Sequence, residues 1–134
     1  MTPEESIERA VRQVGVPCGH WPYTERLTGV AIGWRPRMDS FSPCAGNRPL
    51  RVTVSYDLVV IRTRSAGTEA ERTRYSLYRV LRESGWTIGS MGPETYVEEQ
   101  KRHYWPLVAQ RGFGLTADGQ PYDLTCEEEA SANG

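Results

Sequence analysis

Apolar and polar side chains alternate along residues 50–64, and this pattern constrains the fold more than any other part of the chain. One face of the stretch carries the apolar residues Leu50, Val52, Val54, Tyr56, Leu58 and Val60, and the other carries Arg51, Thr53, Ser55 and Asp57. A period of two residues is typical of a β-strand with one buried face. An unbroken strand of this length would extend about 50 Å, so we expect a β-bulge or an end that projects beyond the core.

Two segments carry the start signals of amphipathic helices. A threonine followed three residues later by a glutamate forms a capping box, which satisfies free amides at a helix N-terminus. The two pairs are Thr2 with Glu5 and Thr68 with Glu71. Apolar residues at helical spacing follow each pair, so we predict helices over residues 3–14 and 68–84. Gly85 then supplies the left-handed conformation that ends the second helix.

The remaining apolar segments are predicted to form strands. They cover residues 27–34, 86–91, 94–99 and 103–115, and Pro106 confines the last of them to a sheet edge or marks a bulge. Residues 35–49 contain no periodic pattern, so we predict a long loop there, and loops of that length tend to be functional or disordered. The expected fold class is α+β, with a mostly antiparallel sheet of four to five strands packed by two helices, and with long loops.

A chain of 134 residues has the length of one domain, which can bury a single core. Apolar residues become sparse after residue 116, so we expect one α+β domain over residues 1–116 and an acidic C-terminal tail over residues 117–134. This tail is expected to be flexible or to dock on a neighbouring molecule. Eleven arginines lie between Arg26 and Arg82, so the basic middle and the acidic end could pair with each other, with other copies or with charged partners.

Composition argues against several classes of protein. The first residues carry carboxylates where a secretory signal needs positive charge, and no apolar stretch approaches the about 20 residues of a membrane span. Three scattered cysteines, Cys18, Cys44 and Cys126, are too few for a disulfide framework and are expected to be reduced in a cytosolic setting. Zinc binding by Cys18, Cys44, His20 and His103 is disfavoured because these residues lack the paired spacing of zinc ligands.

The sequence contains no motif for phosphate or nucleotide binding, no serine elbow and no carboxylate pair placed for acid–base work. We therefore expect no enzyme activity and no cofactor. Two alternatives stay open. A small enzyme would need a pocket with converging polar groups, and a nucleic-acid-binding regulator would need arginines gathered on one face, which a net charge of −1 and the absence of a basic run do not favour.

Aromatic and arginine residues near the predicted loops are the stronger functional lead, because Trp, Tyr and Arg dominate the hot spots of protein interfaces. We assign an oligomer or partner interface to Trp21, Tyr23, Trp34, Arg35, Arg37, Arg48, Arg51, Arg62, Arg64, Tyr104 and Trp105. Two other roles use the same residue types. Aromatic rings also complete small cores, and they also stack on single-stranded nucleic acid.

The order of the predicted elements resembles the tail terminator proteins of long-tailed, siphovirus-like bacteriophages. The resemblance covers residues 1–116, and its strongest parts are LRVTVSYDLVVIRTR leading into TEAERTRYSLYRVLRESGW, and the closing strand HYWPLVAQRGFGL. It implies a structural virion protein that forms a ring, expected to be a hexamer, on the head-proximal end of the tail tube. Such a ring stops tube polymerisation and joins the tube to the neck, and genomic DNA passes through its lumen without sequence-specific binding.

The partners implied by this resemblance are further copies of the chain, the tail-tube protein and neck or connector proteins, and no membrane. The implied location is the virion, after assembly in the host cytoplasm. A head–tail connector or neck protein of the same virion is the nearest alternative, because related folds serve both positions. We expect residues 35–49 and the projecting ends of residues 50–64 to contact other subunits, the tube or the neck, since exposed strand edges can pair between ring neighbours.

Overall fold

The computed structural model describes residues 1–41, 51–90 and 92–124 in full, and the backbone of residues 44–45 and 48–49. These residues form two α-helices, α1 (Pro3–Arg12) and α2 (Gly67–Glu83), and a short 3-10 helix, η1 (Arg64–Ala66), that precedes α2. The strands are β1 (Cys18–His20), β2 (Val30–Phe41), β3 (Cys44–Ala45), β4 (Arg48–Pro49), β5 (Arg51–Arg62), β6 (Thr87–Ser90), β7 (Thr95–Val97), β8 (Arg102–Leu115) and β9 (Pro121–Asp123).

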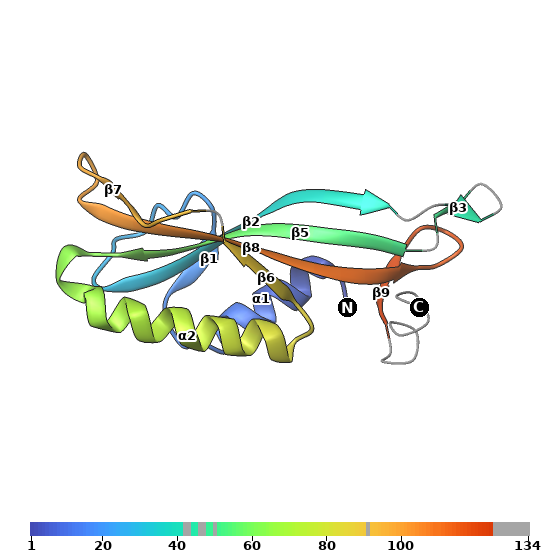
Figure 1. Cartoon of the computed structure of the whole chain (residues 1–134), viewed down its shortest axis with the longest axis horizontal. Helices are drawn as coiled ribbons and strands as arrows, with labels where there is room; N and C mark the ends of the chain where they lie inside the picture. Colours follow the sequence, from blue (N-terminus) through green and yellow to red (C-terminus); the bar gives the residue numbers. More distant parts are fainter. Residues whose placement is uncertain (42–43, 46–47, 50, 91, 125–134) are drawn as a thin grey trace.

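Seven of these strands form one mostly antiparallel sheet (Figure 1). Neighbouring strands follow the order β1-β2-β5-β8-β6, and β7 and β9 also pair with β8. β1 is the parallel member, and β3 and β4 form a separate hairpin. The predicted α+β class is confirmed, but the sheet is larger than the four to five strands expected. The two strands of this sheet that were not predicted, β1 and β9, are three residues long, too short to produce an alternating pattern in the sequence.

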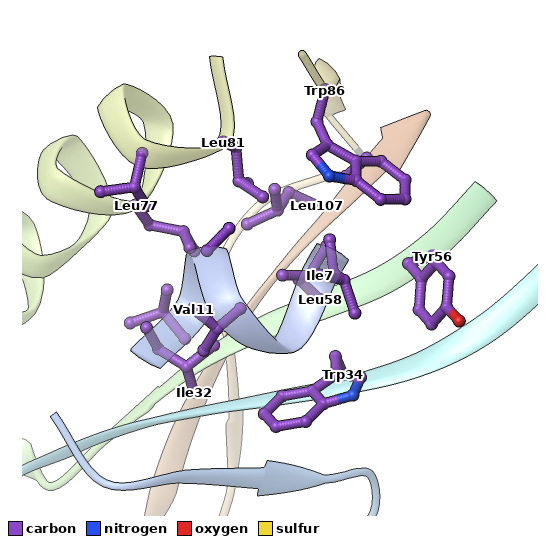
Figure 2. Close-up of a cluster of buried hydrophobic side chains, with 14 of the residues drawn as sticks. Ile7, Val11, Ile32, Trp34, Tyr56, Leu58, Leu77, Leu81, Trp86 and Leu107 are labelled. Carbon is purple, nitrogen blue, oxygen red and sulfur yellow. The ribbon is translucent and has the colours of Figure 1, made fainter. Parts of the chain in front are cut away.

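Both helices pack against one face of the sheet, and the core lies between them and the long strands (Figure 2). The predicted apolar face of β5 is buried there, and each of its described residues is at most 5% exposed: Val52, Val54, Tyr56, Leu58 and Val60. Leu50 lies outside the described residues. The helices contribute Ile7, Val11, Leu77 and Leu81 to the same cluster. Burying an aliphatic side chain of this size contributes about 1.5–3 kcal/mol, so this layer supplies much of the stability of the fold.

A carboxylate in the first turn of α1 ties this helix to the sheet. The predicted capping box is confirmed, because the Thr2 hydroxyl accepts a hydrogen bond from the Glu5 N–H and the Glu5 carboxylate accepts one from the Thr2 N–H, both at 3.2 Å. Glu4 accepts hydrogen bonds from Trp34 Nε1 at 3.0 Å and from the Tyr56 hydroxyl at 2.8 Å. Burial and the hydrogen bond to Glu4 both raise the pKa of Tyr56. Glu4 thus satisfies donors from two strands.

The segment predicted as a long loop contains the second half of β2. Residues 35–41 belong to this strand, which pairs with β5 as far as Phe41, opposite Val52. All seven residues are exposed, so no alternation reveals them in the sequence, and Pro36 argues against a strand. β2 accommodates the proline with a β-bulge, a shift of register between Pro36 and Met38. The bulge expected within residues 50–64 is not found in β5, which pairs with β8 without a shift from Arg51 to Arg62.

The start of α2 also differs from the prediction. The helix begins at Gly67 with Ala66 as its N-cap, and no side chain caps it. The predicted capping box of Thr68 and Glu71 is therefore wrong. A 3-10 turn takes its place, closed by a hydrogen bond from the Ala66 N–H to the Thr63 carbonyl at 3.2 Å. The predicted helix stop is confirmed, since Gly85 has a φ of 88°.

β8 lies inside the sheet rather than at its edge. β5 occupies one side of β8, and β6, β7 and β9 share the other side. On this side β7 pairs with residues 102–104 and β6 with residues 107–110, and Pro106 falls in the gap between them. The edge of β8 is therefore unpaired at Pro106, and the prediction of an edge strand holds at that position only. β9 pairs with residues 113–115. The first part of the predicted tail therefore belongs to the sheet of its own chain, and residues 125–134 lie outside the described residues.

The long strands continue past the helix layer (Figure 1). α2 lies beneath one end of the sheet, and β2, β5 and β8 extend from there toward the β3–β4 hairpin. We call residues 35–41 of β2, together with the paired residues 52–57 of β5, the projecting end. The exposed part of this end is on β2, whereas Val52, Val54 and Tyr56 of β5 belong to the core cluster, so the projection beyond the core expected of residues 50–64 is found on β2 instead.

Replacing Glu4 with alanine is expected to lower the free energy of unfolding by about 1–3 kcal/mol, the cost of a buried donor without a partner. Trp34 and Tyr56 are 1% and 4% exposed, so water replaces the lost carboxylate poorly. The matched control is Glu8→Ala in the same helix, which removes an exposed ion pair with Arg12 worth about 0.3–0.5 kcal/mol. Urea denaturation measures both changes, and equal losses would contradict the role assigned to Glu4.

Candidate interaction surface

Five of the predicted interface residues meet on the face of the sheet opposite the helices. Neighbouring residues of a strand point to opposite faces. Trp34 and Trp105 belong to the helix-covered core, so Arg35 of β2 and Tyr104 of β8 point away from the helices. The chain after β1 crosses this second face and brings Trp21 to Tyr104. We name the set the aromatic–arginine surface; it consists of Trp21, Tyr23, Arg35, Arg37 and Tyr104.

Trp21 is at the centre of this surface. Its ring meets Tyr104 edge to face with the centroids 5.6 Å apart, and the guanidinium carbon of Arg35 lies 5.5 Å from the Trp21 centroid. Gly33 permits this approach, because a Cβ there would lie 3.4 Å from Trp21 and 3.3 Å from Val59. Aromatic and cation–π contacts of this kind contribute about 0.5–1.5 kcal/mol each. The ring is therefore held in place by its own chain.

Asp57 fixes the two arginines of the surface, although it is not among the predicted interface residues. Its Oδ2 accepts a hydrogen bond from Arg35 Nε at 3.2 Å, and its Oδ1 lies 3.7 Å from Arg37 Nη1. This Oδ1 is buried and has no hydrogen-bond partner among the described residues. The arginine side chains remain 53% and 43% exposed. The alternation in residues 50–64 predicts the face on which Asp57 lies. It does not predict the contacts with Arg35 and Arg37, because these residues belong to another strand.

Two adjoining hollows lie beside Trp21. Their volumes are about 620 and 180 Å³, and Trp21, Thr95 and Tyr104 line both. Arg102 holds the wall of the larger hollow by donating hydrogen bonds to the carbonyls of Tyr23, at 3.0 Å, and Glu25, at 2.8 Å. The surface thus combines rings and guanidinium groups that their own chain already orients. Such preorganised aromatic and arginine side chains suit contact with another protein surface.

Two of the predicted aromatic residues lie on the helix side of the sheet. Trp34 is 1% exposed in the core. Trp105 packs beneath α2, where its ring centroid lies 5.7 Å from that of Tyr78 and 4.9 Å from the guanidinium carbon of Arg74. For these two residues the structure shows the core-completing role that the sequence left open.

Arg62 belongs to an internal ion pair at the covered end of the sheet. Its Nη2 and Nε donate hydrogen bonds to the Glu94 carboxylate at 2.8 and 3.0 Å, and its Nη1 donates to the carbonyls of Thr63 and Arg64. The hydrogen bond from Arg62 holds the pKa of Glu94 below its ordinary value. His103 Nδ1 lies 3.4 Å from the same carboxylate. These contacts link β5 and β8 to the segment before β7.

The three remaining predicted arginines are not part of the aromatic–arginine surface. Arg51 lies across Gly112, where any side chain would clash with its guanidinium. Arg64 is exposed at the start of η1. The side chain of Arg48 lies outside the described residues.

β2 has an open edge at the projecting end. β1 pairs with residues 32–34 only, so within the described part of the chain no strand lies on the outer side of residues 35–41. Pro36, the bulge and the charge of Arg37 blunt the first part of this edge, as in edge strands that avoid pairing. Regular pairing to β5 resumes at Met38 and continues to Phe41. Met38 and Phe41 are each 59% exposed, although apolar side chains of this size are usually buried.

In the residues that the structure describes, no three His, Cys, Asp or Glu side chains gather as metal ligands would. Neither α1 nor α2 is long and apolar enough to cross a lipid bilayer. No protein-family model matches the chain, and no curated protein matches it in sequence. A proposal for its function therefore depends on the projecting end, the aromatic–arginine surface and the resemblance described above.

Replacing Glu94 with glutamine is expected to lower the stability at neutral pH by about 1 kcal/mol, because it removes a charge-assisted pair that is partly open to solvent. The pKa of Glu94 is lowered from its ordinary value of 4.5, so the pair stabilises the fold above pH 4.5 and loses its effect as the pH falls through the lowered pKa. Urea denaturation across this range should show the two proteins converging in acid. The control Glu98→Gln, at an exposed turn, should show no such convergence, and a constant difference for Glu94→Gln would contradict the assignment.

Proposed function

We propose that this chain is a structural virion protein of a long-tailed bacteriophage, and that it forms a hexameric ring on the head-proximal end of the tail tube. The ring stops tube polymerisation and joins the tube to the neck, and genomic DNA passes through its lumen. The virion setting of this proposal comes from the resemblance of the sequence. The observation that supports assembly is the open edge of β2, with its exposed residues Met38 and Phe41.

A ring of identical subunits needs a head-to-tail contact, in which one surface of each subunit meets a different surface of the next. The open edge of β2 supplies unpaired backbone groups for the first of these surfaces, as in strand addition between proteins. Met38 and Phe41 lie opposite Ser55 and Val52 of β5, and so on opposite faces of the sheet. A neighbour that pairs with β2 would therefore cover apolar side chains on both faces.

The aromatic–arginine surface is proposed to contact the tail-tube protein or the neck proteins. It lies next to the projecting end, because Arg35 and Arg37 belong to both, and its central ring, Trp21, is fixed before a partner arrives. Fixed aromatic and arginine side chains bind with less loss of conformational entropy than mobile ones. A neck or connector protein of the same virion would use the same features, and tube capping distinguishes the two roles.

The double substitution Met38→Asp and Phe41→Asp is expected to abolish ring formation, or to weaken each subunit contact at least tenfold, about 1.4 kcal/mol. Native mass spectrometry and negative-stain electron microscopy of the purified chain measure the ring. The control is Tyr75→Asp, which changes an apolar residue of similar exposure, 64%, on α2 instead of the projecting end. Rings that persist in the double variant would contradict the role of the open edge.

Tube capping tests the virion role itself. The tail-tube protein of the same phage should polymerise into tubes of uncontrolled length alone, and into tubes with one blocked end when the purified chain is added. A chain that is monomeric in isolation should then form its ring on the tube end. Tubes that grow unchanged and carry no bound chain would overturn the proposal, and binding without an effect on tube growth would favour the neck role.

A further inference from the structure

A second groove lies on the other side of the molecule, between the C-terminal half of α2 and strand β6. It has a volume of about 530 Å³ and is lined by Trp86 together with Tyr75, Tyr78, Arg79, Arg82, Thr87 and Ile88. β6 is the last strand of the sheet and pairs with β8 alone, so its outer edge is open among the described residues. A groove between an open strand edge and a helix is a shape that binds extended peptide segments.

The charge of this groove selects an acidic occupant. Arg79 and Arg82 are exposed and form no ion pair within the described part of the chain, whereas Arg62, Arg102 and Arg111 are bonded to groups of their own chain. Tyr75, beside them, is 64% exposed. Arginine binds carboxylates through charge-assisted, often bidentate hydrogen bonds. An extended segment with successive carboxylates would satisfy both guanidinium groups.

The topology brings such a segment to the mouth of the groove. β9 and β6 lie along the same side of β8, because β5 occupies the other side (Figure 1). β9 pairs Pro121 with Leu115 and Asp123 with Phe113, so the chain leaves it toward Gln110, which is the partner of Thr87 at the start of β6. The step from residue 113 to residue 110 of β8 is about 10 Å.

We propose that the acidic C-terminal segment, residues 125–134, docks into the α2–β6 groove of its own chain. Its three successive carboxylates, Glu127, Glu128 and Glu129, begin four residues after Asp123 and can therefore extend about 13 Å beyond it. Arg111 Nη2 lies 3.7 Å from the Asp123 carboxylate and holds the base of the segment. The docked segment covers the open edge of β6, so strand addition is blocked there while the open edge of β2 stays available.

Double electron–electron resonance tests this proposal in the full-length chain. One spin label is attached to Cys126 and the other to a Glu83→Cys variant at the end of α2, with Cys18→Ala and Cys44→Ala removing the other thiols. The doubly labelled chain is diluted with excess unlabelled chain, so only distances within one molecule are measured. We expect one narrow, short distance, which the double substitution Arg79→Glu and Arg82→Glu broadens and lengthens.

Two controls identify the contact. Arg72→Glu changes an exposed arginine of the same helix that does not line the groove, and it should leave the distance unchanged. Replacing Glu127, Glu128 and Glu129 with arginine in the Arg79→Glu, Arg82→Glu background should restore the short distance. A broad distribution in the unsubstituted chain would overturn the proposal, as would a short distance found only when two singly labelled chains are mixed, because the occupant would then be a second copy. The measurement does not depend on ring formation or on a tail tube.

Discussion

The fold depends on a mismatch of length between one antiparallel ladder and the helices that cover it. β2, β5 and β8 contain twelve, twelve and fourteen residues and extend about 40–46 Å. The ten residues of α1 span only about 15 Å and the seventeen of α2 about 25 Å. Backbone pairing carries the strands beyond the helices, because each strand interior to the ladder satisfies its polar groups without help from the core. The helix layer then needs to bury only one part of the sheet. The projecting end follows from this difference, and the open edge of β2 follows from the short β1, which pairs with residues 32–34 only.

Carboxylates hold together segments that are distant in the sequence. Glu4 joins α1 to β2 and β5, and Glu94 joins the segment before β7 to Arg62 at the end of β5. Asp57 joins β5 to the two arginines of β2. The hydrogen bonds to Glu4 are partly buried, whereas those to Glu94 and Asp57 are charge-assisted but open to solvent. The arginines fall into two groups. Arg35, Arg62 and Arg102 bond to groups of their own chain, whereas Arg79 and Arg82 of α2 form no ion pair among the described residues.

Much of this architecture is predictable from the sequence wherever one face of an element is buried. The alternation of residues 50–64 and the Thr2–Glu5 capping box specify a strand and a helix correctly, because burial and capping leave periodic or local signals. Residues 35–41 leave no such signal, since both of their faces are exposed and only the pairing with β5 makes them a strand. Thr68 shows the opposite error, in which a local signal yields to a preceding 3-10 turn.

The candidate surface is predictable by residue type but not by position. Trp21, Arg35 and Tyr104 lie together on one face of the sheet, yet Trp34, one residue before Arg35, points into the core. Adjacent residues of a strand face opposite layers, and the sequence does not say which layer the helices cover. Asp57 and Arg102 escape prediction because their roles depend on partners from other strands or loops.

The bulge in β2 limits the length of its open edge that can pair with a strand of another chain. Beyond Pro36 and the register shift, regular geometry covers only Met38 to Phe41, a length of about 14 Å that offers two or three hydrogen bonds worth about 0.5–1.5 kcal/mol each. A strand pairing this short would dissociate quickly in an isolated pair of molecules. In the proposed ring this balance would change, because a subunit held at both sides would rebind before it escapes. Incomplete rings would then be scarce, and assembly of the proposed ring would be nearly all-or-none.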